Sequence, residues 1–340
     1  MNKIELKTPY LVFLGDANDL LMAKVAKGVA HWRPEKCLAQ FRLPGAKADL
    51  GLAEMSPREA AACGAKTFIL GLAPVGGTLP MAWLDILIDA MEAGMDIASG
   101  LHMRLNDIPE LVAAAERTGQ KLIDVRVPQG PMVCGTGLPR GGKRLLSVGT
   151  DCCVGKMFTT LAIHRELEQR GVAATFRATG QTGILIEGSG VPVDAVVSDF
   201  ISGMVENLSP DNAPEHWDII EGQGSLLHPA YAGVSLGLLH GAQADVIIVC
   251  HEAGRTQMDE MPGFSVPDLQ TTIDINLTMG RVTNPNIRLG GIALNTVNLT
   301  QEAALAEIAR VEKQFGVPVV DPVRTGVAKI VDGLTEVCYA

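Results

Sequence analysis

Short apolar runs alternate with helical patterns along most of the chain, and this alternation limits the possible folds more than any other feature. In the first half, runs and patterns follow one another at 10–15, 20–32, 66–73, 81–93, 95–101, 109–118 and 121–128. In the second half they follow at 144–148, 156–170, 173–178, 195–207, 217–222, 244–250, 268–279, 288–295, 301–315 and 318–322. A strand, a helix and a further strand form a βαβ unit, so this order predicts parallel sheets covered by helices.

The 340 residues are too many for one ordinary core, and a segment rich in glycine and proline divides them. Residues 128–143, PQGPMVCGTGLPRGGK, have no periodicity, which is typical of a linker. We therefore expect an α/β protein with a Rossmann-like domain at 1–130, a linker at 131–143 and a P-loop NTPase-like domain at 144–340. Because 47% of the residues are hydrophobic but only 4% are aromatic, both cores should be aliphatic.

Charge and composition disfavour several classes of partner. The formal net charge of -10 opposes binding to nucleic acids and to anionic membranes. The N-terminal sequence has no secretory signal pattern, and no run reaches the ~18 apolar residues of a membrane span, so we expect a cytoplasmic protein. The seven cysteines lack the paired spacing of a zinc site or a disulfide framework, and we expect no metal. Only Cys152 and Cys153 lie in a chemically suggestive place, where packing beneath a phosphate is the simpler interpretation.

The most informative motif is SVGTDCCVGKM at 147–157, in which an apolar strand passes through a glycine-containing turn into a helix. Backbone N–H groups and a cationic side chain would surround one point there, which suits a phosphate. The residues expected to hold a phosphate-bearing cofactor are Gly149, Thr150, Asp151, Cys152, Cys153, Val154, Gly155, Lys156 and Met157.

This motif departs from the P-loop pattern G-x-x-x-x-G-K-[ST] at two positions. Thr150 stands where the pattern has glycine, and Met157 stands where it has the hydroxyl that coordinates magnesium. A thioether does not replace that oxygen for magnesium, although Thr159 and Thr160 lie further along the helix. The loop therefore suits phosphate binding better than magnesium-dependent phosphoryl transfer. The alternative is an ordinary strand–turn–helix in which Lys156 is solvated.

The segment GTDCCVGK resembles the GTDxxxGK loop of dethiobiotin synthetase and its relatives. Three further segments resemble that group in the same order, namely FRATGQTG at 176–183, EGQGS at 221–225 and GGIALN at 290–295. The resemblance implies that the first of these contacts substrate and that Asn295 lies on the adenine side. It keeps open an ATP-dependent ligase or kinase that acts on a small carboxylate.

Over both domains the chain is more similar to a family long catalogued as a domain of unknown function, which includes the D-glutamate N-acetyltransferases called DgcN. The segments that carry this resemblance are APVGGTLP at 73–80, SGLH at 99–102, DVRVP at 124–128, RATGQTG at 177–183, SDFISG at 198–203, EGQGSLLHPAYAGVSLGLLHG at 221–241 and CHEAGR at 250–255. The resemblance implies transfer of an acetyl group from acetyl-CoA to the amine of D-glutamate, and a partner enzyme that racemises the N-acetyl product. The preference for D over L comes from the resemblance alone. The phosphates of a CoA ester anchor it without reacting, so a loop without the magnesium hydroxyl suits such a cofactor.

Acyl transfer to an amine needs a base for the amine proton and cations for the acceptor's carboxylates. Arg177 lies at a strand end and Arg255 is placed similarly, so each can pair with a carboxylate, although each could equally form a surface ion pair. Glu221 ends an apolar strand, where desolvation suits a base at neutral pH, and Asp199 and His251 are alternative bases. The other residues expected to bind substrate are Thr179, Gln181, Thr182 and Gln223.

The first domain has no complete dinucleotide-binding fingerprint, so we expect it to cover the cofactor or to form an interface of a homo-oligomer. His102 and His228 have weaker claims to a catalytic role than the three candidates above. A non-catalytic, nucleotide-binding regulator is a third alternative. Met157 is the residue that distinguishes the acetyltransferase hypothesis from the hypothesis of an ATP-dependent enzyme.

Overall fold

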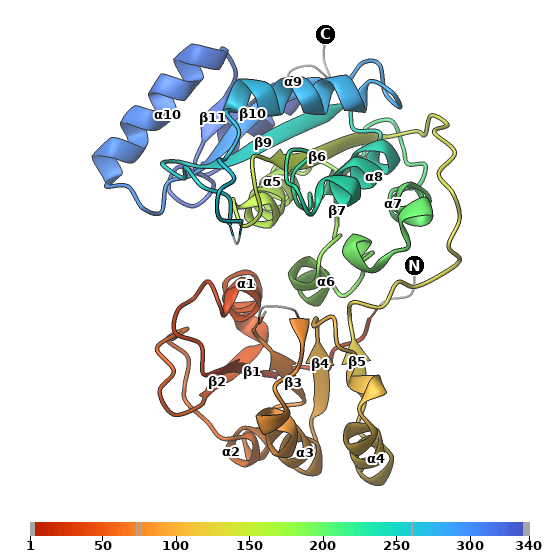
Figure 1. Ribbon diagram of the computed structural model, residues 1–340, viewed down its shortest axis with the longest axis vertical. Coiled ribbons are helices and arrows are strands. Elements are labelled where there is room, and N and C mark those ends of the chain that lie inside the picture. Colours follow the sequence, from red (N-terminus) through yellow and green to blue (C-terminus); the bar gives the residue numbers. More distant parts are fainter. Residues whose placement is uncertain (1–3, 73, 75–76, 260, 336–340) are drawn as a thin grey trace. The chain divides into compact units, whose positions relative to one another are not determined.

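The computed structural model describes residues 4–72, 74, 77–259 and 261–335, which form two compact units, each built on one parallel sheet. The first unit comprises the described residues up to Gln129 together with Gly180–Ala195. The second comprises Gly130–Thr179 and the described residues from Val196 onward (Figure 1). The expected α/β fold class is therefore confirmed.

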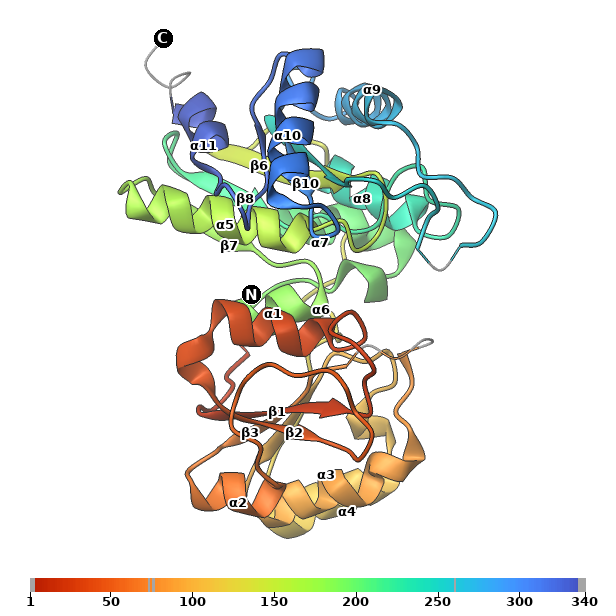
Figure 2. The same ribbon diagram turned by 90° about the vertical axis from the view of Figure 1, so that its left-hand side faces the viewer.

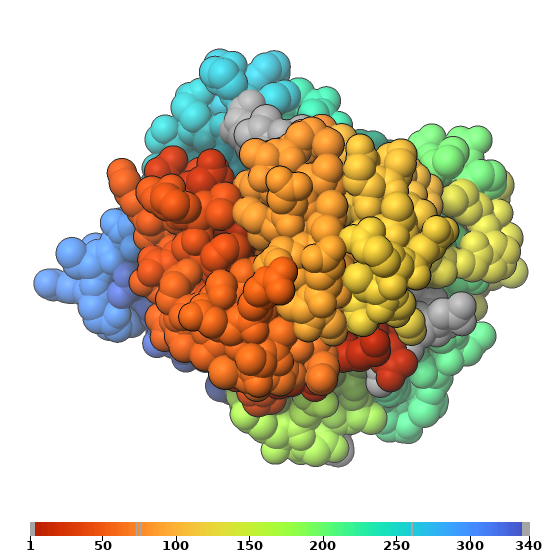
Figure 3. All heavy atoms as spheres, turned by 90° about the horizontal axis from the view of Figure 1, so that it is seen from below, coloured from red at the N-terminus to blue at the C-terminus, as the bar shows by residue number. Residues whose placement is uncertain are grey.

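The first unit is a five-stranded sheet between two layers of helices. Its strands are β1 (Tyr10–Gly15), β2 (Cys37–Arg42), β3 (Thr67–Leu70), β4 (Asp96–Ser99) and β5 (Leu122–Asp124), in the order β2-β1-β3-β4-β5. Its helices include α1 (Lys24–Trp32), α2 (Pro57–Ala62), α3 (Leu84–Glu92) and α4 (Pro109–Thr118). Helix α1 covers one face of the sheet and α2, α3 and α4 cover the other (Figure 2), and the outer surface of these three faces the viewer in Figure 3. Of the segment at 73–80, Ala73, Val75 and Gly76 lie outside the described residues.

The chain returns from the second unit to the first at Gly180–Ala195, which the expected division at 131–143 does not allow for. Helix α6 (Gln181–Glu187) follows a strand of the second sheet, yet it packs against α1 within the first unit. The backbone N–H of Ile4 donates to the carbonyl oxygen of Gly188 at 2.6 Å. Gly100 permits close contact, since a Cβ there would lie 2.3 Å from Gln181 Oε1. The domain expected at 144–340 therefore lacks residues 180–195.

The second unit is a six-stranded sheet whose order is β11-β10-β9-β6-β8-β7. Its strands are β6 (Lys143–Gly149), β7 (Ala174–Arg177), β8 (Trp217–Ile220), β9 (Val246–Glu252), β10 (Arg288–Asn295) and β11 (Val319–Val320). Its helices are α5 (Lys156–Gln169), α7 (Ile201–Leu208), α8 (Ala232–Ala242), α9 (Leu269–Gly280), α10 (Gln301–Phe315) and α11 (Ala328–Thr335). Helices α5 and α11 pack on one face, and α8 and α9 pack on the other. The core beneath α5 is largely aliphatic, as expected, and contains Leu145, Ile163, Ile219 and Ile248.

The sequence pattern did not predict α8, because three glycines interrupt its helical periodicity. Two of them allow α7 to approach closely. A Cβ at Gly241 would lie 2.3 Å from the carbonyl oxygen of Ser202, and one at Gly237 would lie 2.8 Å from Ile201 Cγ2. The glycines thus weaken the helix locally but are needed for the contact between the two helices. Strand β2 and helices α2, α6 and α11 were also not predicted.

Three predicted helices begin at least three residues later than expected. The helix expected at 81–93 begins at Leu84, after a 3-10 turn at Met81–Trp83. The helix expected at 20–32 begins at Lys24, since Asp19 Oδ1 accepts hydrogen bonds from Leu21 N and Met22 N, both at 2.9 Å, and forms a turn first. The helix expected at 195–207 begins at Ile201, after a 3-10 turn at Ser198–Phe200. Among the described residues, no helix combines the length and apolar character that crossing a membrane requires.

Candidate functional site

Segments that follow three neighbouring strands of the second sheet form the candidate site. Strand β6 lies between β8 and β9, and it is parallel to both. Parallel neighbours end at the same edge of a sheet, which is where open α/β sheets bind ligands. The segments at this edge are 149–156 after β6, 221–228 after β8 and 250–259 at the end of β9.

The segment at 149–156, here called the phosphate loop, turns sharply before α5. Gly155 has a φ of 102° and Cys153 has a φ of 56°. A Cβ at Gly149 would lie 2.9 Å from Val154 Cγ2 and 3.2 Å from Lys156 Nζ, so glycine suits this close approach. The first turn of a helix has backbone N–H groups without helical partners and a positive dipole end, and both attract an anion. The backbone therefore has the shape that the motif predicts.

Lys156 opens α5, and its side chain folds back over the phosphate loop. Its Nζ donates to the backbone carbonyl oxygen of Asp151 at 2.7 Å, and the residue is only 7% exposed. This burial excludes the alternative in which Lys156 is solvated. The ammonium group is held at the loop, where it can neutralise a phosphate.

Asp151 is fully buried and connects the phosphate loop to the segment after β9. Its Oδ1 accepts from Cys152 N at 2.6 Å, and its Oδ2 accepts from Asp259 N at 2.8 Å and from Arg255 at 3.0 Å. Arg255 also donates to the carbonyl oxygen of Cys152 at 2.8 Å and to Glu252 at 2.5 Å. These contacts compensate a buried charge and hold the loop in place. The expected contacts of Asp151 with cofactor and of Arg255 with substrate remain predictions.

The hydroxyl groups of α5 are occupied by the backbone of their own helix. Thr159 Oγ1 donates to the carbonyl oxygen of Gly155 at 3.0 Å. Thr160 Oγ1 lies 3.0 Å from the carbonyl oxygens of both Lys156 and Met157. Both threonines are buried, with 1% and 0% exposure. Neither hydroxyl is presented to the loop as the magnesium-binding hydroxyl of a P-loop would be.

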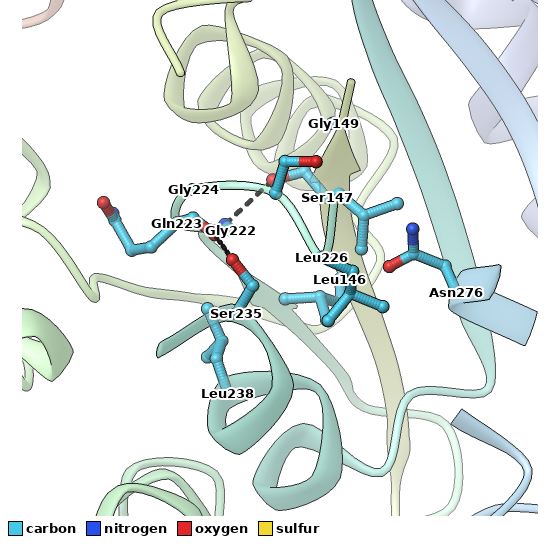
Figure 4. Close-up of a pocket in the computed structure, with 12 residues that line it drawn as sticks. Leu146, Ser147, Gly149, Gly222, Gln223, Gly224, Leu226, Ser235, Leu238 and Asn276 are labelled. Carbon is cyan, nitrogen blue, oxygen red and sulfur yellow. Dashed lines mark hydrogen bonds between the residues drawn. The ribbon is translucent and has the colours of Figure 1, made fainter. Parts of the chain in front are cut away.

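The turn after β8 is pressed against the end of β6 and lines a small pocket (Figure 4). Gly222 N donates to Ser147 Oγ at 2.9 Å, and a Cβ at Gly222 would lie 1.7 Å from the carbonyl oxygen of Ser147. Gly224 has a φ of 57°, and Ser235 Oγ donates to the carbonyl oxygen of Gln223 at 2.8 Å. Only glycine fits at position 222, so this turn packs tightly against the end of β6, beside the phosphate loop.

Glu221 is buried at the start of this turn, with 3% exposure. Its carboxylate accepts from the backbone N–H of Thr179 at 2.9 Å, and Thr179 Oγ1 donates to the backbone carbonyl of Glu221 at 2.6 Å. Gln223 Nε2 donates to the same hydroxyl at 3.2 Å. Three of the predicted site residues therefore lie together and hold the β7 and β8 ends in register.

His251 lies near the end of β9, on the other side of β6 from Glu221. Its Nδ1 is 3.0 Å from Thr150 Oγ1, so it contacts the phosphate loop directly. Burial and the nearby Arg255 charge lower the pKa of the His251 imidazole, although Glu307 and Glu252 oppose this effect. His251 is half-buried, and the lowered pKa keeps it neutral at pH 7.

Arg177 has a partner within the second unit. Its Nε donates to Asp218 Oδ1 at 2.9 Å, and its NH2 lies 2.9 Å from the same oxygen. Asp218 lies near the beginning of β8 and is 1% exposed. The guanidinium group of Arg177 thus forms a buried ion pair away from the strand end, and its expected contact with substrate is not part of this arrangement.

Four further predicted residues also lie outside the described hydrogen bonds of the phosphate loop. Asp199 is exposed in a 3-10 turn, and Thr182 lies in α6 of the first unit. Gln181, with its amide oriented to satisfy both neighbours, donates to Gly100 O at 2.7 Å and accepts from Arg126 at 2.8 Å. Asn295 ends β10, pairs with Glu252 in the sheet register and caps Val297 N at 3.2 Å.

Two cysteines at this edge, Cys152 and Cys250, are protonated thiols. Burial raises the pKa of the Cys152 thiol to about 11, even though Lys156 is nearby. Burial also raises the pKa of the Cys250 thiol to about 11. Neither thiol is therefore a nucleophile at neutral pH, which agrees with the interpretation of Cys152 as a packing residue.

His228 received little weight from the sequence, yet it is buried beside the phosphate loop with 1% exposure. Its Nδ1 accepts from Ala230 N at 3.1 Å, so Nε2 carries the proton, and Nε2 lies 3.8 Å from Asp151 Oδ1. Asp151, Cys152 and His228 place one possible metal-ligating atom each within 4.8 Å of one another. A protonated Nε2 has no lone pair to offer a metal. No spacing in the sequence marks His228, and only its position in the 221–228 segment connects it to the site.

Two family models match the chain. The Rossmann-like domain DUF1611_N matches residues 41–128 and the P-loop domain DUF1611_C matches residues 133–331, both as domains of unknown function. The chain belongs to the DUF1611 family. A DUF1611 protein from Anabaena variabilis, known from a crystal structure, is 31% identical with a TM-score of 0.88, over 97% of this chain and 100% of that one. The expected pairing of a Rossmann-like with a P-loop-like domain is therefore confirmed.

Two curated proteins of similar length extend this comparison. A protein from Tritonibacter scottomollicae is 51% identical over 332 residues, which are 98% of this DUF1611 chain and 100% of that protein. A protein from a Pseudoalteromonas species is 48% identical over 331 residues, 97% of this chain and 100% of that protein. Both are named D-glutamate N-acetyltransferase, which confirms the family resemblance found in the sequence.

Proposed function

We propose that this chain is a D-glutamate N-acetyltransferase, which moves the acetyl group of acetyl-CoA to the amine of D-glutamate and gives N-acetyl-D-glutamate and CoA. The observation that carries the proposal is the 51% and 48% identity, over 98% and 97% of the chain, to two proteins of that name. An ATP-dependent ligase or kinase of the dethiobiotin synthetase type is not favoured.

The phosphate loop supports a CoA ester as the acetyl donor. The phosphates of CoA are only a handle, so the loop needs N–H groups and the Lys156 charge, but no magnesium. Met157 supplies a thioether where a P-loop has its metal-binding hydroxyl, and Thr159 and Thr160 donate to their own helix. This set of side chains is a poor one for a hard cation that prefers oxygen. We therefore infer that no metal takes part.

His251 is our proposed general base. The neutral amine of D-glutamate attacks the thioester carbonyl carbon, the C–N bond forms, the C–S bond breaks and the CoA thiolate leaves. The amine proton passes to the imidazole of His251, and from there to the thiolate. Backbone N–H groups at 223–225 in the turn after β8 are suited to stabilise the oxygen that gains charge, whereas Gly222 N already donates to Ser147 Oγ. Glu221 and Asp199 remain alternative bases, but Glu221 is engaged by Thr179 N and Asp199 is exposed.

We further propose that a racemase acting on N-acetyl amino acids uses the product.

The test of the main proposal incubates the purified protein with acetyl-CoA and D-glutamate, with acetyl-CoA and L-glutamate, and with magnesium, ATP and D-glutamate. Free thiol is followed in the first two mixtures and phosphate in the third. Thiol release that requires D-glutamate is expected, and phosphate release without thiol release would overturn the proposal.

A further inference from the structure

The imidazole of His228 carries a buried donor with no hydrogen-bonding partner among the described residues. Its Nε2 is one of the few buried side-chain nitrogen or oxygen atoms that have no hydrogen-bonding partner among the described residues, and the residue is 1% exposed. Its Nδ1 accepts from Ala230 N at 3.1 Å, which fixes the neutral tautomer with the proton on Nε2. Leaving a buried donor unpaired destabilises a protein, so such a group calls for a function.

The nearest acceptor to this donor belongs to the phosphate loop. Asp151 Oδ1 lies 3.8 Å from His228 Nε2, and the separation would have to shorten by roughly 1 Å to reach hydrogen-bond length. The same oxygen accepts from Cys152 N at 2.6 Å, so the carboxylate moves with the loop backbone. A small shift of the loop therefore decides whether His228 binds Asp151.

Lys156 connects that shift to phosphate binding. Its Nζ donates to the backbone carbonyl oxygen of Asp151 at 2.7 Å. A phosphate competes for this ammonium group, because hydrogen bonds between two charged partners are stronger than those to a neutral carbonyl. Once Lys156 turns to a phosphate, the Asp151 peptide loses the contact that holds it, while Arg255 still pairs with the carboxylate at 3.0 Å.

We propose that His228 is a positioning residue: its Nε2–H binds the Asp151 carboxylate when CoA occupies the phosphate loop, and it thereby fixes the occupied shape of the loop. This inference rests on the proposed function, since CoA supplies the phosphate. A role as general base is disfavoured, because the Nδ1 lone pair is used by Ala230 N and Nε2 is protonated. The same tautomer disfavours a metal held with Cys152.

Two substitutions test the donor. His228→Gln keeps an N–H at a similar reach, whereas His228→Leu keeps most of the volume without a donor. Leucine removes both the donor toward Asp151 and the acceptor for Ala230 N, whereas the glutamine amide retains one group of each kind. His164→Gln, in the middle of α5 where the half-buried His164 faces Glu168, serves as a matched control.

The measurements are the CoA dissociation constant by calorimetry and the imidazole N–H resonances of histidine-labelled protein with and without CoA. We expect roughly tenfold weaker CoA binding in His228→Leu, recovery of most of the affinity in His228→Gln, and no change in His164→Gln. We also expect an N–H resonance, assigned to His228 by its loss in the Gln variant, to move downfield when CoA is added.

The outcomes separate this inference from the proposed function. Wild-type CoA affinity in both His228 variants, equal loss in both, or a His228 resonance that CoA does not move would overturn the positioning role alone. A wild-type protein that neither binds CoA nor transfers acetyl groups would overturn the proposed function and this inference together.

Discussion

Two buried aspartates of the second unit have contrasting surroundings. Asp218, near the start of β8, accepts from Arg177 at 2.9 Å, from Ser209 Oγ at 2.6 Å and from Asn212 at 3.3 Å. Asp151, at the opposite edge of the sheet, pairs with Arg255 but lies beside the Nε2–H of His228, which has no hydrogen-bonding partner in the part of the chain that the structure describes. Both carboxylates are compensated by an arginine, and only Asp151 has an unsatisfied neighbour.

The contrast separates a supporting network from a ligand site. A buried ion pair whose polar atoms are all satisfied holds the fold in one arrangement, and removal of one partner is costly. A buried carboxylate beside an unpaired donor, in a loop that starts a helix, has polar contacts that a ligand can complete. We therefore expect substitutions around Asp218 to lower stability and substitutions around Asp151 to lower acetyl-CoA affinity.

The largest expected change is in stability, for Asp218→Asn. Loss of the carboxylate charge leaves Arg177 without a counter-ion, and we expect the free energy of unfolding to fall by about 3 kcal/mol. Urea denaturation of the full chain measures it. The matched variant Asp151→Asn should lose less stability, because Arg255 still has Glu252 as a counter-ion, to which it donates at 2.5 Å. This variant should instead show a higher Michaelis constant for acetyl-CoA. Equal stability losses with unchanged kinetics in both variants would remove the contrast.

The next largest expected effect is on kcat, when the proposed general base His251 is replaced. His251→Gln should lower kcat by roughly 100-fold, the lower end of general base contributions. Protonation of the substrate amine already lowers kcat/KM at higher pH, because the neutral amine attacks. Because burial and Arg255 lower the pKa of His251, the wild type should show a further acid limb below pH 6.5, as the pH drops through that lowered pKa. The variant should lose this acid limb. A limb that persists in His251→Gln would transfer the role to Glu221 or another group.

Lys156→Ala should raise the Michaelis constant for acetyl-CoA roughly 30-fold, or by about 2 kcal/mol, because a hydrogen bond to a charged partner is lost. The constant for D-glutamate should change by less than about threefold, since the lysine is proposed to hold only the cofactor. Lys313→Ala, on the exposed surface of α10, is the control. Equal increases for both substrates would argue against a lysine that anchors the cofactor.

Cys152→Ala should have the smallest effect. Its thiol has a pKa of about 11 and is protonated at pH 7.5, so kcat should stay within about twofold of the wild type. Iodoacetamide at that pH should inactivate the wild type slowly. Rapid inactivation that CoA prevents would instead indicate a reactive thiolate in the phosphate loop.

Much of the fold follows from local patterns in the sequence. Strand β6 and helix α5 were predicted within a residue or so, because an apolar run, a glycine turn and a helical pattern follow one another there. Helix α8 was not predicted, because its glycines serve a contact with α7 that only the tertiary structure reveals. The return of α6 to the first unit was missed for the same reason, since its partner α1 lies far away in the sequence.

The sequence predicted which segments form the site, but not which side chains pair with one another there. Arg177 and Arg255 both lie at or just beyond the end of a strand and look equivalent in the sequence, yet Arg177 pairs with Asp218 and Arg255 with Asp151. Which carboxylate an arginine meets depends on the packing of distant loops. His228 shows the same limit, because the unpaired state of its Nε2 is a property of the folded neighbourhood alone.

Calorimetric titration of CoA into the wild-type protein, with magnesium or with EDTA, tests most directly whether the phosphate loop anchors an unreactive phosphate. We predict the same dissociation constant within about twofold in both buffers, and weaker binding in Lys156→Ala. CoA binding that is undetectable, together with ATP binding that requires magnesium, would contradict the account.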